Sequence, residues 1–199
     1  MFLEGDRVRL RPFDLADAAT FQAWINDVDV ARLVGRVPFQ ASIPAEEQFI
    51  RGGIVNDWEH GIHLAIEAID GEEPVLIGTI DLRDLHPVAR HGEIGILVGE
   101  RAYWNRGFGS DAVRTICRYG FEDMDLHRIS LTVAAYNPRA QRAYEKVGFV
   151  IEGRLRDHRY AAGRYHDTLV MGLLREDFEA REAERLVSKD AAGAASRPA

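Results

Sequence analysis

The sequence predicts an α+β fold, in which one domain holds a central mixed, mostly antiparallel sheet of about seven strands flanked by about four helices. Segments with the period of a strand and segments with the period of a helix follow one another in a fixed order: strand, two helices, three strands, helix, strand, helix, two strands. The length of 199 residues suits one domain of ordinary size, and no Gly-, Ser- or Pro-rich linker divides its middle.

The composition is that of a soluble globular protein, with 46% hydrophobic and 29% charged residues. No apolar run approaches the roughly 18 residues of a membrane helix, and the first residues do not resemble a signal peptide, so we expect a cytoplasmic protein with no membrane partner. The formal net charge of −7 argues weakly against nucleic acid as a partner. A single cysteine, Cys117, excludes a disulfide framework within the chain.

The first elements are a short strand and two helices. Residues 8–11 alternate apolar and polar side chains, as a half-buried strand does. Asp14 is the expected N-cap of a helix that runs to about Trp24. A loop with glycine and prolines is expected over residues 33–44, and a second helix over 45–58.

Three strands and a helix make up the middle of the chain. The strands are expected at 63–69, 75–82 and 93–98, and the residues at 70–73 form a hairpin turn between the first two. Apolar residues at helical spacing then predict a helix over 110–124.

One helix and three strands close the domain. Pro138 suits the first turn of a helix, and Gly148 suits its end. The expected elements are a strand at 128–133, a helix at 138–147, and strands at about 149–159 and 165–174. The domain is therefore predicted to cover residues 1–175. A charged tail follows over 176–199, helical at first and disordered at its low-complexity end.

A glycine-containing loop joins the strand at 93–98 to the helix at 110–124. It reads Trp104-Asn105-Arg106-Gly107-Phe108-Gly109-Ser110-Asp111. Free N–H groups at a helix N-terminus form an anion site, and glycines let a ligand approach the backbone, so a diphosphate is the natural guest. The loop lacks the spacing of a Walker or dinucleotide motif, and taken alone it is better explained as an ordinary strand–helix connection.

A second group of residues begins where the next strand ends. Asn137 and Tyr144 are seven residues apart, about two helical turns, so both can face the ligand of the preceding loop. The alternative is that Asn137 only caps the helix and Tyr144 is only a core aromatic. The residues themselves leave these two interpretations equally open.

Together the two motifs resemble the GNAT superfamily of acetyl-coenzyme A-dependent N-acetyltransferases. The shared pattern is strand, Arg-Gly-x-Gly loop, helix, strand, and Asn-Pro-x-Ala-x-x-x-Tyr-x-x-x-Gly-Phe, over roughly residues 8–174. Leu126-His127-Arg128-Ile129 and Gly163-Arg164-Tyr165-His166-Asp167 also resemble the branch of the ribosomal-protein N-terminal acetyltransferases and the spermidine acetyltransferase. The resemblance implies a sheet that splays between its fourth and fifth strands, and acetyl-coenzyme A as co-substrate.

The resemblance also implies which residues bind coenzyme A. Those that wrap the pyrophosphate are Arg106, Gly107, Phe108, Gly109 and Ser110. The backbone of Leu97 and Val98 pairs with the pantetheine arm, and Asn137 holds its end. Either Arg139 or Arg142 meets the adenosine phosphates. The chain departs from the family pattern at Trp104, where glutamine or arginine is usual; this does not affect binding by backbone groups.

The implied reaction is direct attack of a primary amine on the thioester in a ternary complex. Tyr144 has the type and position to protonate the departing thiolate, and Glu93 is the best candidate base, acting through water. A solvated strand-edge carboxylate is an equal alternative for Glu93. Cys117 falls on the apolar helix face and is expected to be a buried structural thiol rather than a nucleophile. The histidines lack metal-ligand spacing, so no metal is predicted.

The amine acceptor is left open between a peptide N-terminus and a small-molecule amine. The early loop at 33–39 holds an arginine and no carboxylate, which weakens a polyamine assignment, although Asp27, Asp29 and Asp167 could receive a cation. Two other functions remain: a non-catalytic acyl-coenzyme A sensor or interaction module, and a plain nucleotide-binding protein. A homodimer is common in this branch, although no sequence feature demands it.

Overall fold

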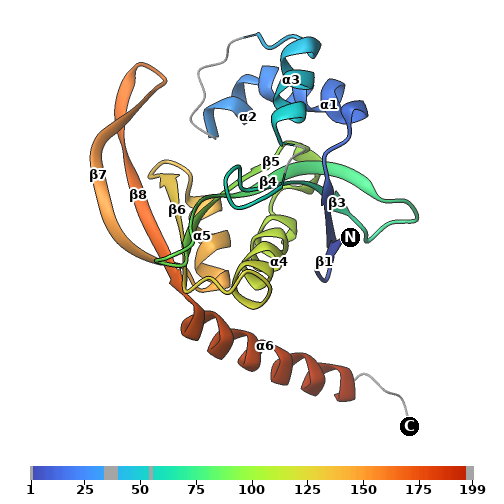
Figure 1. The fold of residues 1–199 in the computed structure, drawn as a ribbon, viewed down its shortest axis with the longest axis vertical. Coiled ribbons are helices and arrows are strands. Elements are labelled where there is room, and N and C mark those ends of the chain that lie inside the picture. The colour runs from blue at the N-terminus through green and yellow to red at the C-terminus, as the bar shows by residue number, and fades with distance from the viewer. Residues whose placement is uncertain (1, 34–39, 54–55, 196–199) are drawn as a thin grey trace.

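The computed structural model describes residues 2–33, 40–53 and 56–195. Their strands form one eight-stranded sheet in the order β1-β2-β3-β4-β5-β6-β8-β7 (Figure 1). The strands are β1 (Leu3–Glu4), β2 (Val8–Pro12), β3 (Ile62–Ala68), β4 (Val75–His86), β5 (His91–Val98), β6 (Arg128–Ala134), β7 (Val150–Ala161) and β8 (Arg164–Leu174). The helices are α1 (Ala18–Asn26), α2 (Val28–Leu33), α3 (Ile43–Gly53), α4 (Phe108–Glu122), α5 (Pro138–Val147) and α6 (Arg175–Ala195), with short 3-10 turns at Leu15–Asp17 and Arg101–Tyr103.

The α+β fold class and the mixed, mostly antiparallel sheet are confirmed. All strand pairs are antiparallel except β5 and β6, which run parallel and pair only where His91–Glu93 faces Arg128–Ser130. Beyond Glu93 these two strands diverge, which is the splay expected between the fourth and fifth predicted strands. A parallel pair that opens in this way leaves one edge of β5 without a strand partner.

Two short elements, β1 and α2, contribute to the difference between the expected and observed numbers of strands and helices. β1 has two residues, too few for any period to show in the sequence. The six residues of α2 are equally short, and they follow α1 after only Asp27. The structure therefore has eight strands where about seven are expected, and six helices in its described part where about four are expected.

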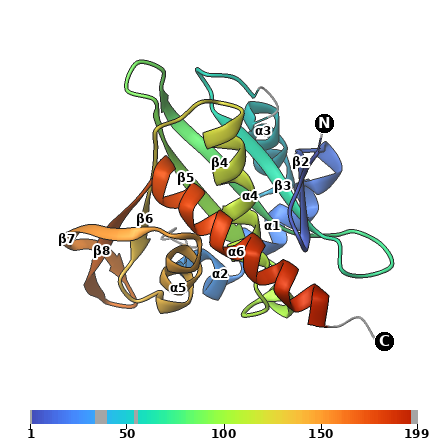
Figure 2. The same ribbon diagram turned by 90° about the horizontal axis from the view of Figure 1, so that it is seen from below.

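Helices cover both faces of the sheet (Figures 1 and 2). Side chains of a strand alternate between faces, and in β3 Leu64 and Ile66 join the larger core cluster whereas Ala65 joins the smaller one. The larger cluster contains the apolar faces of α4 and α5, and the smaller one contains α1 to α3 with Phe21 and Trp24. The two helical layers thus lie on opposite faces and approach the sheet where β5 and β6 part.

The second predicted helix has different ends from those expected. It begins at Ile43 rather than residue 45, because Pro44 is tolerated in a first turn, and it ends at Gly53 rather than residue 58. The loop expected at 33–44 is shorter at both ends, since Leu33 belongs to α2, and its residues 34–39 lie outside the described part of the chain. Among the described residues no helix is both long and apolar enough to cross a bilayer.

The C-terminal helix α6 packs against the domain (Figure 2). Phe178 is buried in the larger core cluster, with its ring centroid 5.2 Å from that of Phe121 in α4. At the other end of the helix, Arg185 and Lys189 form ion pairs with Asp6 at 3.1 and 2.7 Å. The helix continues to Ala195, through the alanines where the sequence predicts the start of disorder; residues 196–199 lie outside the described part.

Candidate active site

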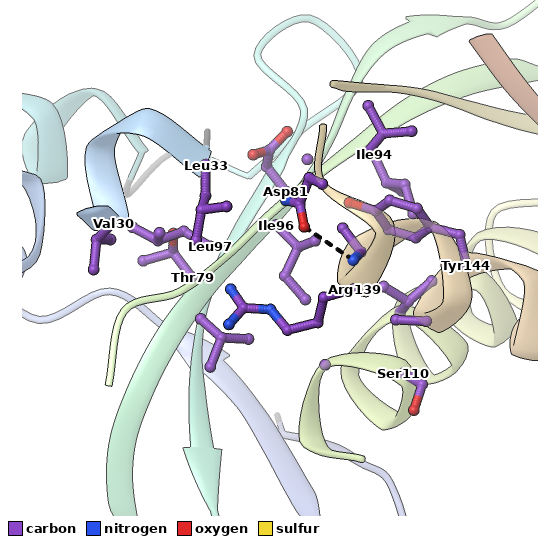
Figure 3. Close-up of a pocket in the computed structure, with 18 of the residues that line it drawn as sticks. Val30, Leu33, Thr79, Asp81, Ile94, Ile96, Leu97, Ser110, Arg139 and Tyr144 are labelled. Atoms are coloured by element: carbon purple, nitrogen blue, oxygen red, sulfur yellow. Dashed lines mark hydrogen bonds between the residues drawn. The ribbon is translucent and has the colours of Figure 1, made fainter. Parts of the chain in front are cut away.

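A cavity of about 810 Å³ lies where β5 and β6 diverge (Figure 3). Its walls come from α4 and α5 on one side and from α1 to α3 on the other, and Arg159 near the end of β7 adds to the lining. Tyr144 and Arg139 enter it from α5, opposite Val30 and Leu33 of α2. A cavity of this size suits a large organic ligand.

The glycine loop presents unpaired backbone donors to this cavity. Gly107 has a φ of +89°, which favours glycine, and it caps α4 without a side-chain hydrogen bond. The first backbone bond of the helix runs from the Asp111 N–H to the Gly107 carbonyl at 3.0 Å, so the N–H groups of residues 108–110 have no acceptor within the helix. The Asp111 carboxylate accepts from the N–H groups of Arg7 and Val8 instead, at 2.7 and 3.1 Å, and leaves the helix end open to an anion.

The predicted loop residues divide into two groups. Gly107, Gly109 and Ser110 line the cavity. The Phe108 side chain is buried in the core, 5.1 Å from the Tyr103 ring, and the Arg106 guanidinium lies over these same two rings. Neither Arg106 nor Phe108 is part of the lining, so these two side chains do not reach into the cavity.

On β5, Leu97 and Val98 line the cavity along the strand edge that β6 leaves free. The Val98 carbonyl accepts a hydrogen bond from the Trp104 indole Nε1 at 2.7 Å. The Arg139 guanidinium stacks on the other side of the loop, 3.7 Å from the Trp104 ring centroid. Trp104, noted in the sequence as a departure from the family pattern, therefore fastens the loop to β5 and α5.

Helix α5 brings the predicted Asn137 and Tyr144 into the cavity. Asn137 is buried and caps the helix, its Oδ1 accepting from the Ala140 N–H at 3.1 Å. Tyr144 is 7% exposed. Burial, reinforced by the Asp81 charge, raises the pKa of Tyr144 above its usual range, so the phenol stays protonated and able to donate. Arg142 also lines the cavity, from a more exposed position on the same helix.

Asp81, a residue that no sequence motif singled out, is one of the two carboxylates in the described lining, together with Glu46. Glu93 lies outside the lining and forms an ion pair with Arg83 at 2.8 Å. Asp81 sits on β4 opposite Gly95 of β5, and a Cβ at Gly95 would come within 2.8 Å of the Asp81 Oδ2. Burial raises the pKa of Asp81, although the bonded Arg83 guanidinium opposes this shift. The signal in the sequence that could have identified Asp81 is a charged residue within a strand of mainly apolar residues.

The wall opposite Tyr144 is mainly apolar. Its apolar side chains are Phe21, Ile25, Val30, Leu33 and Phe49. Glu46 is buried in the same wall, and His63 lies beside it with its Nε2 3.0 Å from the His60 carbonyl. These residues come from α1 to α3 and β3.

The aspartates considered as cation sites are already paired. Arg101 binds Asp27 and Asp29 at 2.8 and 2.6 Å, and Arg154 binds Asp167 at 2.7 Å. None of these three carboxylates is part of the cavity lining.

Cys117 is fully buried in α4, as expected, and burial raises the pKa of its thiol well above the usual range. Over the part of the chain that the structure describes, no three His, Cys, Asp or Glu side chains gather as a metal site would require.

A smaller hollow of about 470 Å³ borders the same glycine loop on its other side. Gly107 and Ser110 line both hollows, and so does Lys146 of α5. Helix α6 supplies the far wall of the smaller one, including Arg181. The loop thus has basic side chains from two helices next to its free N–H groups.

Comparison with known proteins identifies this architecture. The family model for the acetyltransferase (GNAT) domain matches residues 7–150. YoaA of Bacillus subtilis, named an uncharacterized N-acetyltransferase, is 31% identical over 173 residues, covering 87% of this chain and 96% of YoaA. YdaF of the same organism, whose name provisionally assigns ribosomal N-acetylation, is 30% identical over 152 residues, covering 73% of this chain and 80% of YdaF. The crystal structure of Vibrio cholerae spermidine N-acetyltransferase with CoA and spermine superposes with a TM-score of 0.76 at 25% identity, covering 86% of this chain and 98% of that one.

Proposed function

Since the chain belongs to the GNAT family and is an N-acetyltransferase that transfers an acetyl group to an amine, we propose that it uses acetyl-coenzyme A, bound in the cavity between β5 and α5. A primary amine then attacks the thioester directly, in a ternary complex. The family evidence gives no support to a non-catalytic acyl-coenzyme A sensor.

The residues present fit coenzyme A. The free N–H groups at the start of α4 suit the pyrophosphate, with Gly107, Gly109 and Ser110 lining the approach. The unpaired edge of β5 at Leu97 and Val98 suits the amide groups of the pantetheine arm, which pair with backbone much as a strand does. The Val98 carbonyl already accepts from Trp104, so the pantetheine amides must use the remaining groups of this edge.

Basic side chains surround the expected position of the adenosine phosphates. Arg142 and Lys146 are exposed on α5 and line the cavity, and Arg181 faces the adjoining hollow from α6. Arg139 points across the cavity and stacks on Trp104. We therefore assign the phosphates to Arg142 and Lys146, and assign to Arg139 the bracing of the loop.

Tyr144 is the proposed general acid. Its hydroxyl forms no hydrogen bond with any described residue, and its raised pKa keeps the proton available at neutral pH. When the C–S bond breaks, the thiolate needs a proton, and a positioned phenol supplies it. A phenylalanine at this position would retain the packing and lose only the proton.

Asp81 is the proposed proton acceptor, in place of Glu93. An amine is mostly protonated at neutral pH and must lose a proton before it attacks. Asp81 lines the cavity and its charge reaches Tyr144, whereas the Glu93 carboxylate is bound to Arg83 outside the lining. Glu93 then acts on Asp81 through Arg83 and through its own negative charge.

The observation that carries this proposal is that the open helix end and the buried Tyr144 share one cavity. The test measures thiol release from acetyl-coenzyme A over a panel of amines: peptides, polyamines, aminoglycosides and amino acids. We expect turnover with at least one class, and its loss in Tyr144→Phe with binding of acetyl-coenzyme A retained by calorimetry. Binding without turnover for every amine would instead favour the sensor.

The proposal also includes a cytoplasmic location and a homodimer. A cytoplasmic location is supported by the use of one buried cysteine, which suits a reducing compartment. A homodimer is supported by the exposed apolar side chains Val150, Ile151 and Leu155 along the sheet-edge strand β7. Sedimentation analysis of the purified chain tests the second point. No nucleic acid or membrane partner is part of the proposal.

A further inference from the structure

The charges that line the cavity are unevenly matched. The described lining contains two carboxylates, Glu46 and Asp81. It contains five cationic side chains, namely Arg83, Arg139, Arg142, Lys146 and Arg159. Arg142 and Lys146 of α5 lie beside the expected phosphates, Arg139 of the same helix stacks on Trp104, and Arg83 is paired with Asp81 and Glu93. Arg159 is left without an assigned counter-charge at the reaction end of the cavity.

Arg159 is held in place but not neutralised. It lies on β7, half-buried, and its Nε donates to the Thr168 Oγ1 at 3.1 Å. Thr168 is fully buried on β8, so this bond fixes the direction of the guanidinium. No carboxylate of the described residues pairs with Arg159, whereas its neighbour Arg154 binds Asp167 at 2.7 Å. A half-buried guanidinium with free donors is a receptor for an anion.

This cation and Asp81 both line the cavity that holds Tyr144. The charges of both side chains act on the Tyr144 hydroxyl, with Asp81 raising the pKa of Tyr144 and Arg159 lowering it. Asp81 and Arg159 come from opposite parts of the sheet, β4 and β7, and both line the cavity around Tyr144. A molecule that binds there meets a negative group on one side and a positive group on the other.

The third feature is the apolar wall formed by α1 to α3. Phe21, Val30 and Phe49 are among its side chains, and Val30 faces Tyr144 across the cavity. A ligand that packs against this wall needs a bulky apolar group next to its charged groups.

From these three features we propose that the acceptor is a free amino acid with a large apolar side chain. Arg159 binds its carboxylate, Asp81 binds its amino group, and the wall of α1 to α3 holds its side chain. This proposal rests on the acetyltransferase function and names its substrate class.

The ammonium gives one proton to Asp81, which passes it to solvent, and the amine nitrogen attacks the thioester carbonyl carbon. The N–C bond forms, the C–S bond breaks, and Tyr144 donates its proton to the thiolate. The second proton that the nitrogen loses restores Tyr144. The products are the N-acetyl amino acid, free coenzyme A and one proton.

The same charges disfavour two other acceptors. The further ammonium groups of a polyamine would lie near Arg159, in a cavity whose described lining has more cationic side chains than carboxylates. In a peptide the carboxylate next to the amine is replaced by a neutral amide, which leaves Arg159 without its anion. The structure of the spermidine enzyme thus shares the fold of this chain, while the cavity charges favour a different substrate.

A matched set of acceptors tests the proposal: phenylalanine, phenylalaninamide, phenethylamine and spermidine, each with acetyl-coenzyme A. We expect kcat/KM for phenylalanine to exceed that for each of the others by at least about tenfold, since a site built for a polar group rejects analogues that lack it. The amide has the less basic amine and so the larger reactive fraction. A preference for the acid over the amide therefore cannot arise from a larger fraction of unprotonated amine.

Variants of β7 complete the test. Arg159→Gln should abolish the preference for phenylalanine over phenethylamine, measured as the ratio of their kcat/KM values, and Arg159→Lys should restore part of that preference. Arg156→Gln, on the same strand but outside the lining, is the control and should change neither rate. The proposal is overturned if wild-type enzyme uses the amide as well as the acid, or if Arg159→Gln slows all acceptors equally. Turnover with other amines alone would overturn it and leave the acetyltransferase function intact.

Discussion

The guanidinium of Arg139 lies 3.7 Å from the ring centroid of Trp104, so a cation–π contact joins α5 to the glycine loop across the mouth of the cavity. The indole Nε1 of the same tryptophan donates to the Val98 carbonyl at 2.7 Å. Burial lowers the pKa of Arg139, which no described carboxylate neutralises, so the aromatic face is its main stabilising partner. The loop that is to bind pyrophosphate is therefore set in place before any ligand arrives.

This contact predicts the effect of altering Trp104. Trp104→Ala should weaken binding of acetyl-coenzyme A about fivefold or more, because a cation–π contact of about 1 kcal/mol and the bond to Val98 are both lost. Trp104→Phe keeps the aromatic face and should weaken binding of acetyl-coenzyme A less. Calorimetric Kd values measure both, and Trp58→Ala, at an exposed tryptophan outside the cavity lining, is the control. An unchanged Kd in Trp104→Ala would show that the loop needs no brace.

Tyr144→Phe isolates the proposed proton donor. General acid catalysis contributes about 10²–10⁴-fold, so kcat should fall within that range. The Kd for acetyl-coenzyme A and the thermal midpoint should stay unchanged, because the hydroxyl bonds to no described side chain and the ring still packs 6.0 Å from Phe149. Turnover assays, calorimetry and a melting curve on one preparation measure kcat, the Kd and the thermal midpoint. A normal kcat would remove Tyr144 from the chemistry.

The pH dependence of turnover distinguishes Asp81 from Glu93. Burial raises the pKa of Asp81, and the nearby charge of Glu93 raises it further. An acceptor of protons works only when ionised, so activity should fall with decreasing pH at a value above the ordinary range of an aspartate. Asp81→Asn should lose most activity.

Glu93→Gln removes a negative charge from the neighbourhood of Asp81. The pKa of Asp81 should then decrease, and the acid limb of the kcat/KM profile should move to lower pH with the plateau largely kept. Loss of the plateau together with the limb would instead identify Glu93 as the base, as the sequence suggested. The two variants measured over the same pH range separate the roles.

The two motifs on local segments were predictable because their geometry depends on few neighbours. Gly107 begins a helix, and Asn137 and Tyr144 lie two turns apart on one helix, so spacing alone brings each group to one side. The divergence of β5 and β6 places both motifs on one cavity, and only the family resemblance implied it.

The side chains that spacing could not predict reach the cavity through strand register. Asp81 faces it because it pairs with Gly95, and a one-residue shift would have presented its neighbours instead. The same register places Arg83 opposite Glu93 and removes that carboxylate from the site. Arg159 depends on a register shift within the β7–β8 hairpin, between Leu155 and Arg159, which no period in the sequence shows.

Helix α6 tests where the domain ends. The sequence predicts a domain that stops at residue 175. If that boundary is right, a chain truncated after residue 175 should remain stably folded. The burial of Phe178 against Phe121 predicts the opposite: Phe178→Ala should cost about 3–5 kcal/mol of unfolding free energy, as loss of a core phenylalanine does. Urea denaturation measures this cost.

A matched change on the same helix separates stability from ligand binding. Arg181 lines the hollow beside the glycine loop and forms no ion pair within the described chain, so Arg181→Gln should leave the unfolding free energy unchanged. If Arg181 approaches the 3′-phosphate, the variant should weaken binding of coenzyme A severalfold and leave binding of dephospho-coenzyme A unaffected. Equal weakening of both ligands would mean that α6 acts through the loop rather than on the phosphate. If Arg181→Gln leaves coenzyme A binding unchanged and Phe178→Ala leaves the unfolding free energy unchanged, α6 is a tail and the domain ends at Arg175.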